Sequence, residues 1–393
     1  MKSDNTFASE SMFFCKLCVF PSTKPHMEFN KDGVCTGCLA YINRKEIDWN
    51  DRKKKFLEII EKYKKTSKDY YNCIIPSSGG KDSHYQTIKA LEFGMNPLIV
   101  NIVPDKLSEL GKYNKDNLKK LGVDTMEISL NPKIRHRINK FGLETVGDIC
   151  WPEHITIFTI PKKISVNMNI PLLLYGECAE NENGGPVEDQ DRTILDRRWM
   201  EEYGGLLGLR TNDLEDILQI PKEKLVLYTY PSKEELAEIG TTALFLGQFF
   251  PWDGHTNAKI AKENGFKTYN KDVEGSIVDY ENLDNVYFRV HDYFKFLKYG
   301  YDRVTDWCSW HIRRGRLTRD EAVKLNQERS GKFPESYLGY SLTEILNEID
   351  CTRDEFIKIC DKFTNKNLFM CDKNNNLLKD NHGSLILKNS EYK

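Results

Sequence analysis

Residues 76–83, PSSGGKDS, follow the apolar run YYNCII and precede the stretch HYQTIKALEFG, which has the pattern of a helix. Gly79 and Gly80 allow backbone conformations that side chains forbid, and they let the backbone come close to a ligand. The free N–H groups at the start of the next helix favour a negatively charged ligand. Further hydroxyl or charged groups come from Ser77, Ser78, Lys81, Asp82 and Ser83. The stretch therefore predicts a phosphate-binding turn between a strand and a helix.

The turn does not have the Walker A pattern. That motif needs a glycine five positions before the Gly-Lys pair and a Ser or Thr directly after it, and here Ile75 and Asp82 occupy those places. The alternative is an ordinary glycine turn with a capping Ser or Asp, which is common in loops. The complete string, placed between a strand and a helix, favours the phosphate site.

Short apolar runs alternate with helical patterns after residue 71, which predicts an α/β fold with a parallel sheet and helices on both faces. The expected strands are 72–77, 96–103, 124–130 and 170–177, and the expected helices between them include 82–94 and 110–122. Ligands of such sheets bind at the carboxyl ends of the strands. Asn101 ends the second expected strand and is a candidate for the same site.

The composition is that of a globular protein of roughly two to three domains, because 393 residues exceed what a single core usually organises. The 57 basic and 59 acidic residues give a formal net charge of −2, so we expect neither nucleic acid nor an anionic membrane as a partner. No run of about 18 apolar residues is present. The first residues lack the apolar core of a signal peptide, so we expect a cytoplasmic protein without membrane insertion.

Four of the eleven cysteines form two Cys-x-x-Cys pairs, Cys15 with Cys18 and Cys35 with Cys38. Two such pairs are typical of a four-thiolate zinc site, in which each turn supplies two ligands. The segment is too short to fold on a core of its own, and metal binding can supply its folding energy. Because a site of four cysteines has no open position, we expect the zinc to be structural. A redox pair is the alternative.

The string around residues 76–83 resembles the PP-loop signature of ATP pyrophosphatases. The resemblance implies an adenine-nucleotide α-hydrolase-like sheet, cleavage of ATP between its α- and β-phosphates, and transfer of AMP to a substrate oxygen. The implied ATP- and pyrophosphate-binding residues are Ser77, Ser78, Gly79, Gly80, Lys81, Asp82, Ser83 and Asn101. The candidate catalytic residues are Lys81, Asp82 and Glu177. Glu177 follows an expected strand, and a polar loop residue is its alternative interpretation.

Nearly the whole chain resembles the N-acetyl sugar amidotransferase family. The resemblance lies in the strings CKLCVFPSTKP, GVCTGC, PSSGGKDSHYQ, LLLYGE, FFPWDGHTN and FLKYGYDRVTDWCSWHIRRGRLTRDEAV. It implies conversion of an acetamido group to an acetamidino group in bacterial surface-glycan synthesis, including lipopolysaccharide and flagellin sugars. The implied substrate is pseudaminic acid, legionaminic acid or a nucleotide-linked diacetamido uronic acid. ATP and Mg²⁺ are the implied cofactors, and a separate glutaminase subunit is the implied source of ammonia.

The resemblance and the pattern together predict four segments. They are a four-cysteine zinc module similar to a zinc ribbon at 1–45, a linker helix at 46–70, a PP-loop ATP-binding domain at 71–230, and a mostly helical substrate or partner region at 231–393.

An acidic sugar substrate requires a positively charged or hydrogen-bonding pocket. The substrate candidates are Trp252, Asp253, Arg303, His311 and Arg314. The alternative for the basic stretch around residue 313 is a solvated helix face.

A tRNA-modifying enzyme that activates a base carbonyl with ATP and delivers sulfur is the main rival function. Such an enzyme needs reactive cysteines, and Cys150 and Cys178 are the candidates because each lies near an expected strand end or loop. A non-enzymatic zinc module that binds ATP as a regulator is a third interpretation.

Overall fold

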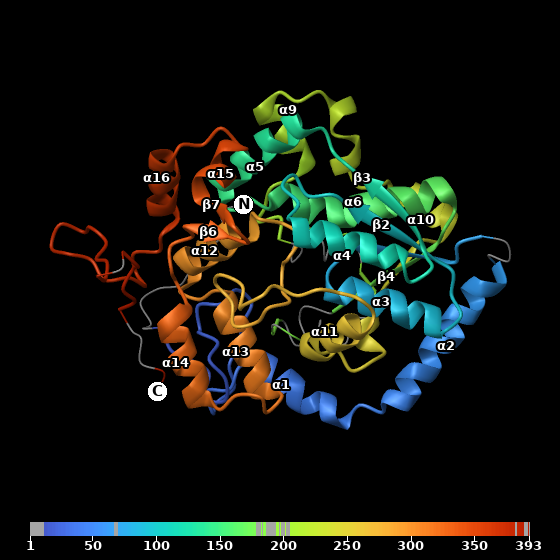
Figure 1. Ribbon diagram of the computed structural model, residues 1–393, viewed down its shortest axis with the longest axis horizontal. Helices are drawn as coiled ribbons and strands as arrows, with labels where there is room; N and C mark the ends of the chain where they lie inside the picture. Colours follow the sequence, from blue (N-terminus) through green and yellow to red (C-terminus); the bar gives the residue numbers. More distant parts are fainter. Residues whose placement is uncertain are drawn as a thin grey trace.

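The computed structural model describes residues 12–66, 70–177, 182, 184–185, 194–195, 197, 201, 205–381, 383–388 and 392. A five-stranded sheet with the strand order β3-β2-β1-β4-β5 lies at its centre (Figure 1). The strands are β1 (Cys73–Ser77), β2 (Pro97–Ile102), β3 (Asp124–Ile128), β4 (Leu172–Tyr175) and β5 (Thr242–Phe245). Every neighbouring pair is parallel. The predicted α/β class with a parallel sheet is confirmed.

The two faces of the sheet are covered by different helices. Successive residues of a strand point to opposite faces, so each strand contributes to two separate apolar cores. Cys73 and Ile75 face one apolar core, and Ile74 between them faces another. The helices of the first face are α2 (Trp49–Thr66), α3 (Lys81–Glu92) and α4 (Glu109–Lys119). Those of the opposite face are α5 (Pro132–Val146) and α6 (Trp151–Met168). The sheet is therefore the middle layer of three.

The strand β5 was not predicted from the sequence, in which the strand pattern fades beyond about residue 230. It pairs with β4, placing Leu172 opposite Thr242 and Tyr175 opposite Phe245. The short apolar run of this strand cannot be told from a buried helical turn by periodicity alone. The sheet consequently extends past residue 230, where the sequence pattern had placed the end of the ATP-binding domain.

The C-terminal part of the chain is mostly helical, as predicted. The α-helices described from residue 211 onward are α9 (Thr211–Leu218), α10 (Lys233–Ile239), α11 (Gly254–Glu263), α12 (Phe288–Tyr299), α13 (Arg303–Arg313), α14 (Arg319–Arg329), α15 (Leu342–Asn347) and α16 (Arg353–Phe363). A short hairpin joins β6 (Ser336–Tyr337) to β7 (Tyr340–Ser341). Residues of α11, α12, α13, α15 and α16 share one apolar core. None of the helices described is long and apolar enough to cross a membrane.

The N-terminal four-cysteine module lies against the C-terminal helices, far from it in sequence. It contains α1 (Thr36–Asn43) and two isolated antiparallel bridges, Phe14 with Pro21 and Phe29 with Cys35. Its apolar core includes Tyr301, which lies two residues before the start of α13. In Figure 1 the long helix α2 leads from this module along the sheet domain. The module and the C-terminal helices thus form one packed unit.

Candidate active site

The strand order reverses beside β1, because the chain places β2 and β3 on one side of it and then returns to add β4 on the other. Ligands of open parallel sheets bind at the carboxyl ends of the strands at such a reversal. The loop 78–80 follows β1, and Gly176 and Glu177 follow β4. The topology therefore places the predicted phosphate turn and the candidate Glu177 at the same crevice.

The loop after β1 is organised by serine hydroxyls. The backbone N–H of Gly79 donates to Ser77 Oγ at 3.0 Å, that of Gly80 donates to Ser78 Oγ at 3.3 Å, and that of Ser78 donates to Ser83 Oγ at 3.3 Å. Each hydroxyl keeps its own proton to donate to an anion, since it accepts in these bonds.

Gly79 is the residue of the loop for which only glycine fits. Its φ is +82°, and a Cβ at this position would lie 2.8 Å from the Cα of Lys115. The loop backbone consequently lies directly against α4. A side chain here would be strained by its φ and would also collide with backbone atoms.

Lys81 is the buried cation of the site, with a side chain only 7% exposed. Its Nζ lies 2.7 Å from Asp82 Oδ2 and 2.7 Å from Glu281 Oε2. Burial alone would lower the pKa of Lys81, but the charges of Asp82 and Glu281 and their hydrogen bonds raise it above its ordinary value. Asn257 Nδ2 donates to Asp82 Oδ1 at 2.8 Å. The lysine is therefore held charged.

Desolvation by the surrounding chain and then the neighbouring charge of Asp82 raise the pKa of Glu177 to about 7, although the residue itself is exposed. Lys81 acts in the opposite direction, and Glu281 adds to the rise. The site thus combines three carboxyl groups with one ammonium. Carboxylate oxygens are the ligands that Mg²⁺ prefers, so this group suits a magnesium-bound phosphate ester.

Asn101 lies in register with Ser77 across β1 and β2, and with Glu127 on β3. Its side chain is 2% exposed, and its Nδ2 has no hydrogen-bond partner in the part of the chain that the structure describes. A buried amide left unpaired costs about 1–3 kcal/mol. A ligand at this edge would supply the missing acceptor.

Four of the five substrate candidates form one network beside the loop. Asp253 caps the N-terminus of α11 and accepts two hydrogen bonds from Arg316, at 2.9 Å and 2.8 Å. Arg314 Nε lies 3.0 Å from Asp253 Oδ1, and another of its nitrogens donates to the Trp252 carbonyl at 2.8 Å. His311 Nδ1 accepts from Arg316 Nε at 2.6 Å. Burial and then the charge of Arg316 lower the pKa of His311 to about 4.

Arg303, the fifth substrate candidate, has other partners. Its guanidinium lies 3.4 Å from Asp292 and 3.6 Å from Asp306. A substrate carboxylate would therefore compete with two carboxylates of the protein itself.

Aromatic rings connect the loop to this network. Lys81 Nζ lies 5.7 Å from the ring centre of Trp307 and 6.0 Å from that of Tyr280. The Trp307 and His311 rings are 5.5 Å apart. A Cβ on Gly254 would lie 3.0 Å from Trp307 and 3.2 Å from Lys81 Cε. The lysine consequently lies between the loop and the start of α11.

Three residues of the site were not predicted from the sequence, namely Asn257, Tyr280 and Glu281. Their contacts join positions up to 200 residues apart, such as Lys81 with Glu281. Asn257 ends the string FFPWDGHTN, which had been noted, but no local pattern marks Glu281.

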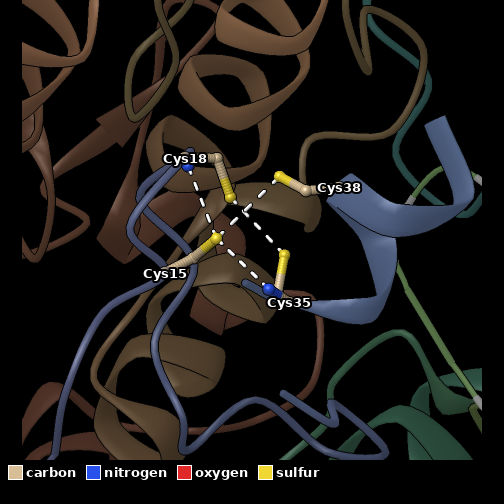
Figure 2. Close-up of side chains that lie close together, drawn as sticks. All are labelled: Cys15, Cys18, Cys35 and Cys38. Atoms are coloured by element: carbon tan, nitrogen blue, oxygen red, sulfur yellow. Dashed lines mark hydrogen bonds between the residues drawn. The ribbon is translucent and has the colours of Figure 1, made fainter. Parts of the chain in front are cut away.

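The four predicted zinc ligands meet at one point, as Figure 2 shows. The Sγ atoms of Cys15 and Cys38 are 3.9 Å apart, and those of Cys18 and Cys35 are 3.7 Å apart. A tetrahedral zinc ion with Zn–S bonds of about 2.3 Å requires sulfur atoms about 3.8 Å apart. All four side chains are buried. The cluster fits a closed structural zinc site.

Arg313 of α13 lies directly against this cluster. Its guanidinium nitrogens lie 3.4 Å from Cys38 Sγ, 3.8 Å from Cys35 Sγ and 4.0 Å from Cys18 Sγ. Four thiolates around Zn²⁺ carry a net charge of about −2, which one arginine partly neutralises. Since Arg314 follows in sequence, the zinc module and the Asp253 network share this stretch of chain.

Of the two cysteines considered for sulfur transfer, the structure describes only Cys150. Cys150 is fully buried in the apolar core, and burial raises the pKa of its thiol well above the ordinary value. This environment is the opposite of that of a reactive cysteine. Cys178 lies outside the described residues.

One family model matches part of the chain. Residues 263–381, which include Tyr280 and Glu281, match the family described as "LPS biosynthesis protein WbpG-like, C-terminal domain". No curated protein matches the chain.

Two solved structures are similar to the chain at low scores. NMN synthetase from Francisella tularensis is 12% identical with a TM-score of 0.27, and covers 56% of this chain and 96% of its own. A predicted subunit of tRNA methyltransferase from Methanocaldococcus jannaschii is 16% identical with a TM-score of 0.21, and covers 47% of this chain and 94% of its own.

The variant Arg313→Gln is expected to bind zinc about 10–100-fold more weakly, because the thiolate charge loses its neighbouring cation. Competition with a chromogenic chelator measures the affinity. The control is Arg353→Gln, which removes an arginine that pairs with Glu335 at the surface. Equal zinc affinity of Arg313→Gln and the control would contradict a role for Arg313 at the metal.

Proposed function

We propose that this protein is an ATP-dependent N-acetyl sugar amidotransferase of bacterial surface-glycan synthesis. The observation that supports it most is the contact between Lys81 of the glycine loop and Glu281 of the WbpG-like domain. This ion pair joins a loop suited to pyrophosphate to a segment that matches a family of lipopolysaccharide biosynthesis proteins. The site thus lies between a nucleotide-binding sheet and a glycan-related domain.

The proposed reaction activates an amide oxygen. The acetamido oxygen of the sugar attacks the α-phosphorus of ATP, the bond to the β-phosphate bridging oxygen breaks, and pyrophosphate leaves. Ammonia then attacks the imidate carbon, and AMP departs with the former amide oxygen. The products are an acetamidino sugar, AMP and pyrophosphate, and no side chain acts as a nucleophile.

The residues of the loop supply the electrostatics of the first step. The hydroxyls of Ser77, Ser78 and Ser83 and the N-terminus of α3 face the departing pyrophosphate, and Lys81 neutralises its growing charge. The carboxylates around Lys81 suit Mg²⁺, which shares that charge when bound. Because Lys81 is already held by Asp82 and Glu281, little reorganisation is needed.

Glu177 is the proposed general base of the second step. An ammonia molecule that attacks the imidate becomes positively charged and must lose a proton. A carboxyl group with a pKa of about 7 accepts this proton efficiently near neutral pH. The position of Glu177 after β4, beside the loop that follows β1, agrees with this role.

We further propose that a separate glutaminase subunit supplies the ammonia. Neutral ammonia is scarce at neutral pH, and the resemblance to N-acetyl sugar amidotransferases implies such a partner. The proposed substrate is an acetamido nonulosonic acid or a nucleotide-linked diacetamido uronic acid.

The reaction is tested with ATP, ammonium and an acetamido sugar whose amide oxygen carries ¹⁸O. Mass spectrometry should show the acetamidino sugar without the label and AMP with one ¹⁸O in its phosphate, because AMP leaves with that oxygen. Glutamine in place of ammonium should give no product until a glutaminase is added. Label in free phosphate, or a product that contains sulfur, would contradict the proposal.

The pH dependence tests Glu177. The pKa of about 7 predicts that the rate, expressed per concentration of neutral ammonia, rises with pH through about 7 as the carboxyl group ionises. Glu177→Gln should lose this rise and about 10²–10⁴-fold in rate. The exposed residue Glu144 provides the control variant Glu144→Gln. A Glu177→Gln enzyme that keeps the wild-type profile would exclude Glu177 as the base.

A further inference from the structure

A second group of metal-binding side chains lies away from the four cysteines and outside the proposed active site. Asp148 and Cys150 lie in the turn between α5 and α6, His154 lies in the first turn of α6, and His291 lies in the first turn of α12. The ligand atoms of Asp148, Cys150 and His291 lie within 4.8 Å of one another. The three segments thus bring together a carboxylate, a thiol and two imidazoles.

Asp148 is the centre of the group. One carboxylate oxygen lies 2.8 Å from His291 Nδ1 and the other lies 3.0 Å from His154 Nδ1. The two imidazole rings are 5.1 Å apart. Asp148 is 2% exposed and Cys150 is fully buried. The two imidazoles therefore converge on one carboxylate beside a buried thiol.

The backbone that presents Asp148 and Cys150 is rigidly built. Gly147 ends α5 in the left-handed conformation, with φ +63°, and the N–H of Asp148 donates to the Gly142 carbonyl at 3.1 Å. The N–H of Cys150 donates to Asp148 Oδ1 at 2.9 Å. Asn139 Nδ2 donates to the Ile149 carbonyl at 2.7 Å. Such fixed positions favour a binding site, because little order has to be gained on binding.

Charge balance favours a divalent ion at this place. A carboxylate and a thiolate together carry two negative charges, so a divalent cation bound to both and to the neutral imidazole of His291 makes the buried group neutral. An uncompensated buried charge is costly. Imidazole and thiolate suit Zn²⁺ and similar transition metals, whereas Mg²⁺ and Ca²⁺ prefer oxygen ligands.

We propose that Asp148, Cys150 and His291 bind one divalent transition-metal ion of the zinc class, while His154 contacts the second carboxylate oxygen of Asp148. Binding releases the thiol proton of Cys150 to solvent and leaves the metal with three protein ligands and one position for water. Two of the ligands come from the sheet domain, and His291 belongs to the WbpG-like segment 263–381. The ion joins these two parts of the chain, independently of the reaction proposed above.

The metal content of the full-length protein, saturated with Zn²⁺ and then dialysed, tests the site. We expect roughly two zinc ions per wild-type chain, one in the four-cysteine cluster and one here. His291→Asn and Cys150→Ser should each retain about one. The matched control His136→Asn changes a histidine of α5 that lies outside the group, and it should retain both ions. Two ions in His291→Asn, or one in the wild type, would overturn the proposal.

A second measurement uses the wild-type protein alone, in case a variant does not fold. X-ray absorption of the zinc-loaded chain reports the average ligands of the metal. Two sites predict on average about two or three sulfur ligands per zinc, with nitrogen and oxygen as the remainder. Four sulfur ligands per zinc would show that only the four-cysteine cluster is occupied, and the group around Asp148 would then be a hydrogen-bonded network without metal.

Discussion

The paired ammonium of Lys81 is the interaction on which the rest of the site depends. A buried cation without partners is unstable, and removing one partner of a buried ion pair typically costs about 3–5 kcal/mol. Lys81 has two, Asp82 beside it in sequence and Glu281 from the C-terminal region. The same contact therefore fixes the lysine at the end of the sheet and joins the two regions of the chain.

A continuous series of polar contacts extends from this lysine to the zinc cluster. Asp82 accepts a hydrogen bond from Asn257 of α11, and Asp253 caps that helix. Asp253 in turn binds Arg314, and the preceding residue, Arg313, lies against the zinc thiolates. A zinc ion bound by the four cysteines would order the end of α13, although it would have no open position for chemistry. This arrangement gives a physical reason for an N-terminal module that contacts the last third of the chain.

Local patterns predicted the parts of the structure that depend on neighbours in sequence. The glycine turn between β1 and α3 and the meeting of the four cysteines follow from short motifs with fixed spacing. The strand β5 was missed because a run of four residues, three of them apolar, does not distinguish a strand from a helical turn. The contacts of Glu281 with Lys81 and of Arg313 with the cysteine cluster could not be predicted, because each joins residues that are far apart in the sequence.

The central claim is that the loop after β1 binds the phosphates of ATP and releases pyrophosphate as a unit. Chromatography of the products from adenine-labelled ATP, with sugar and ammonium present, tests it most directly in the wild type and two glycine variants. Gly79 and Gly122 both have positive φ, but a Cβ would collide only at Gly79. The account predicts AMP from the wild type and from Gly122→Ala, and no product from Gly79→Ala. Formation of ADP, or full activity of Gly79→Ala, would contradict it.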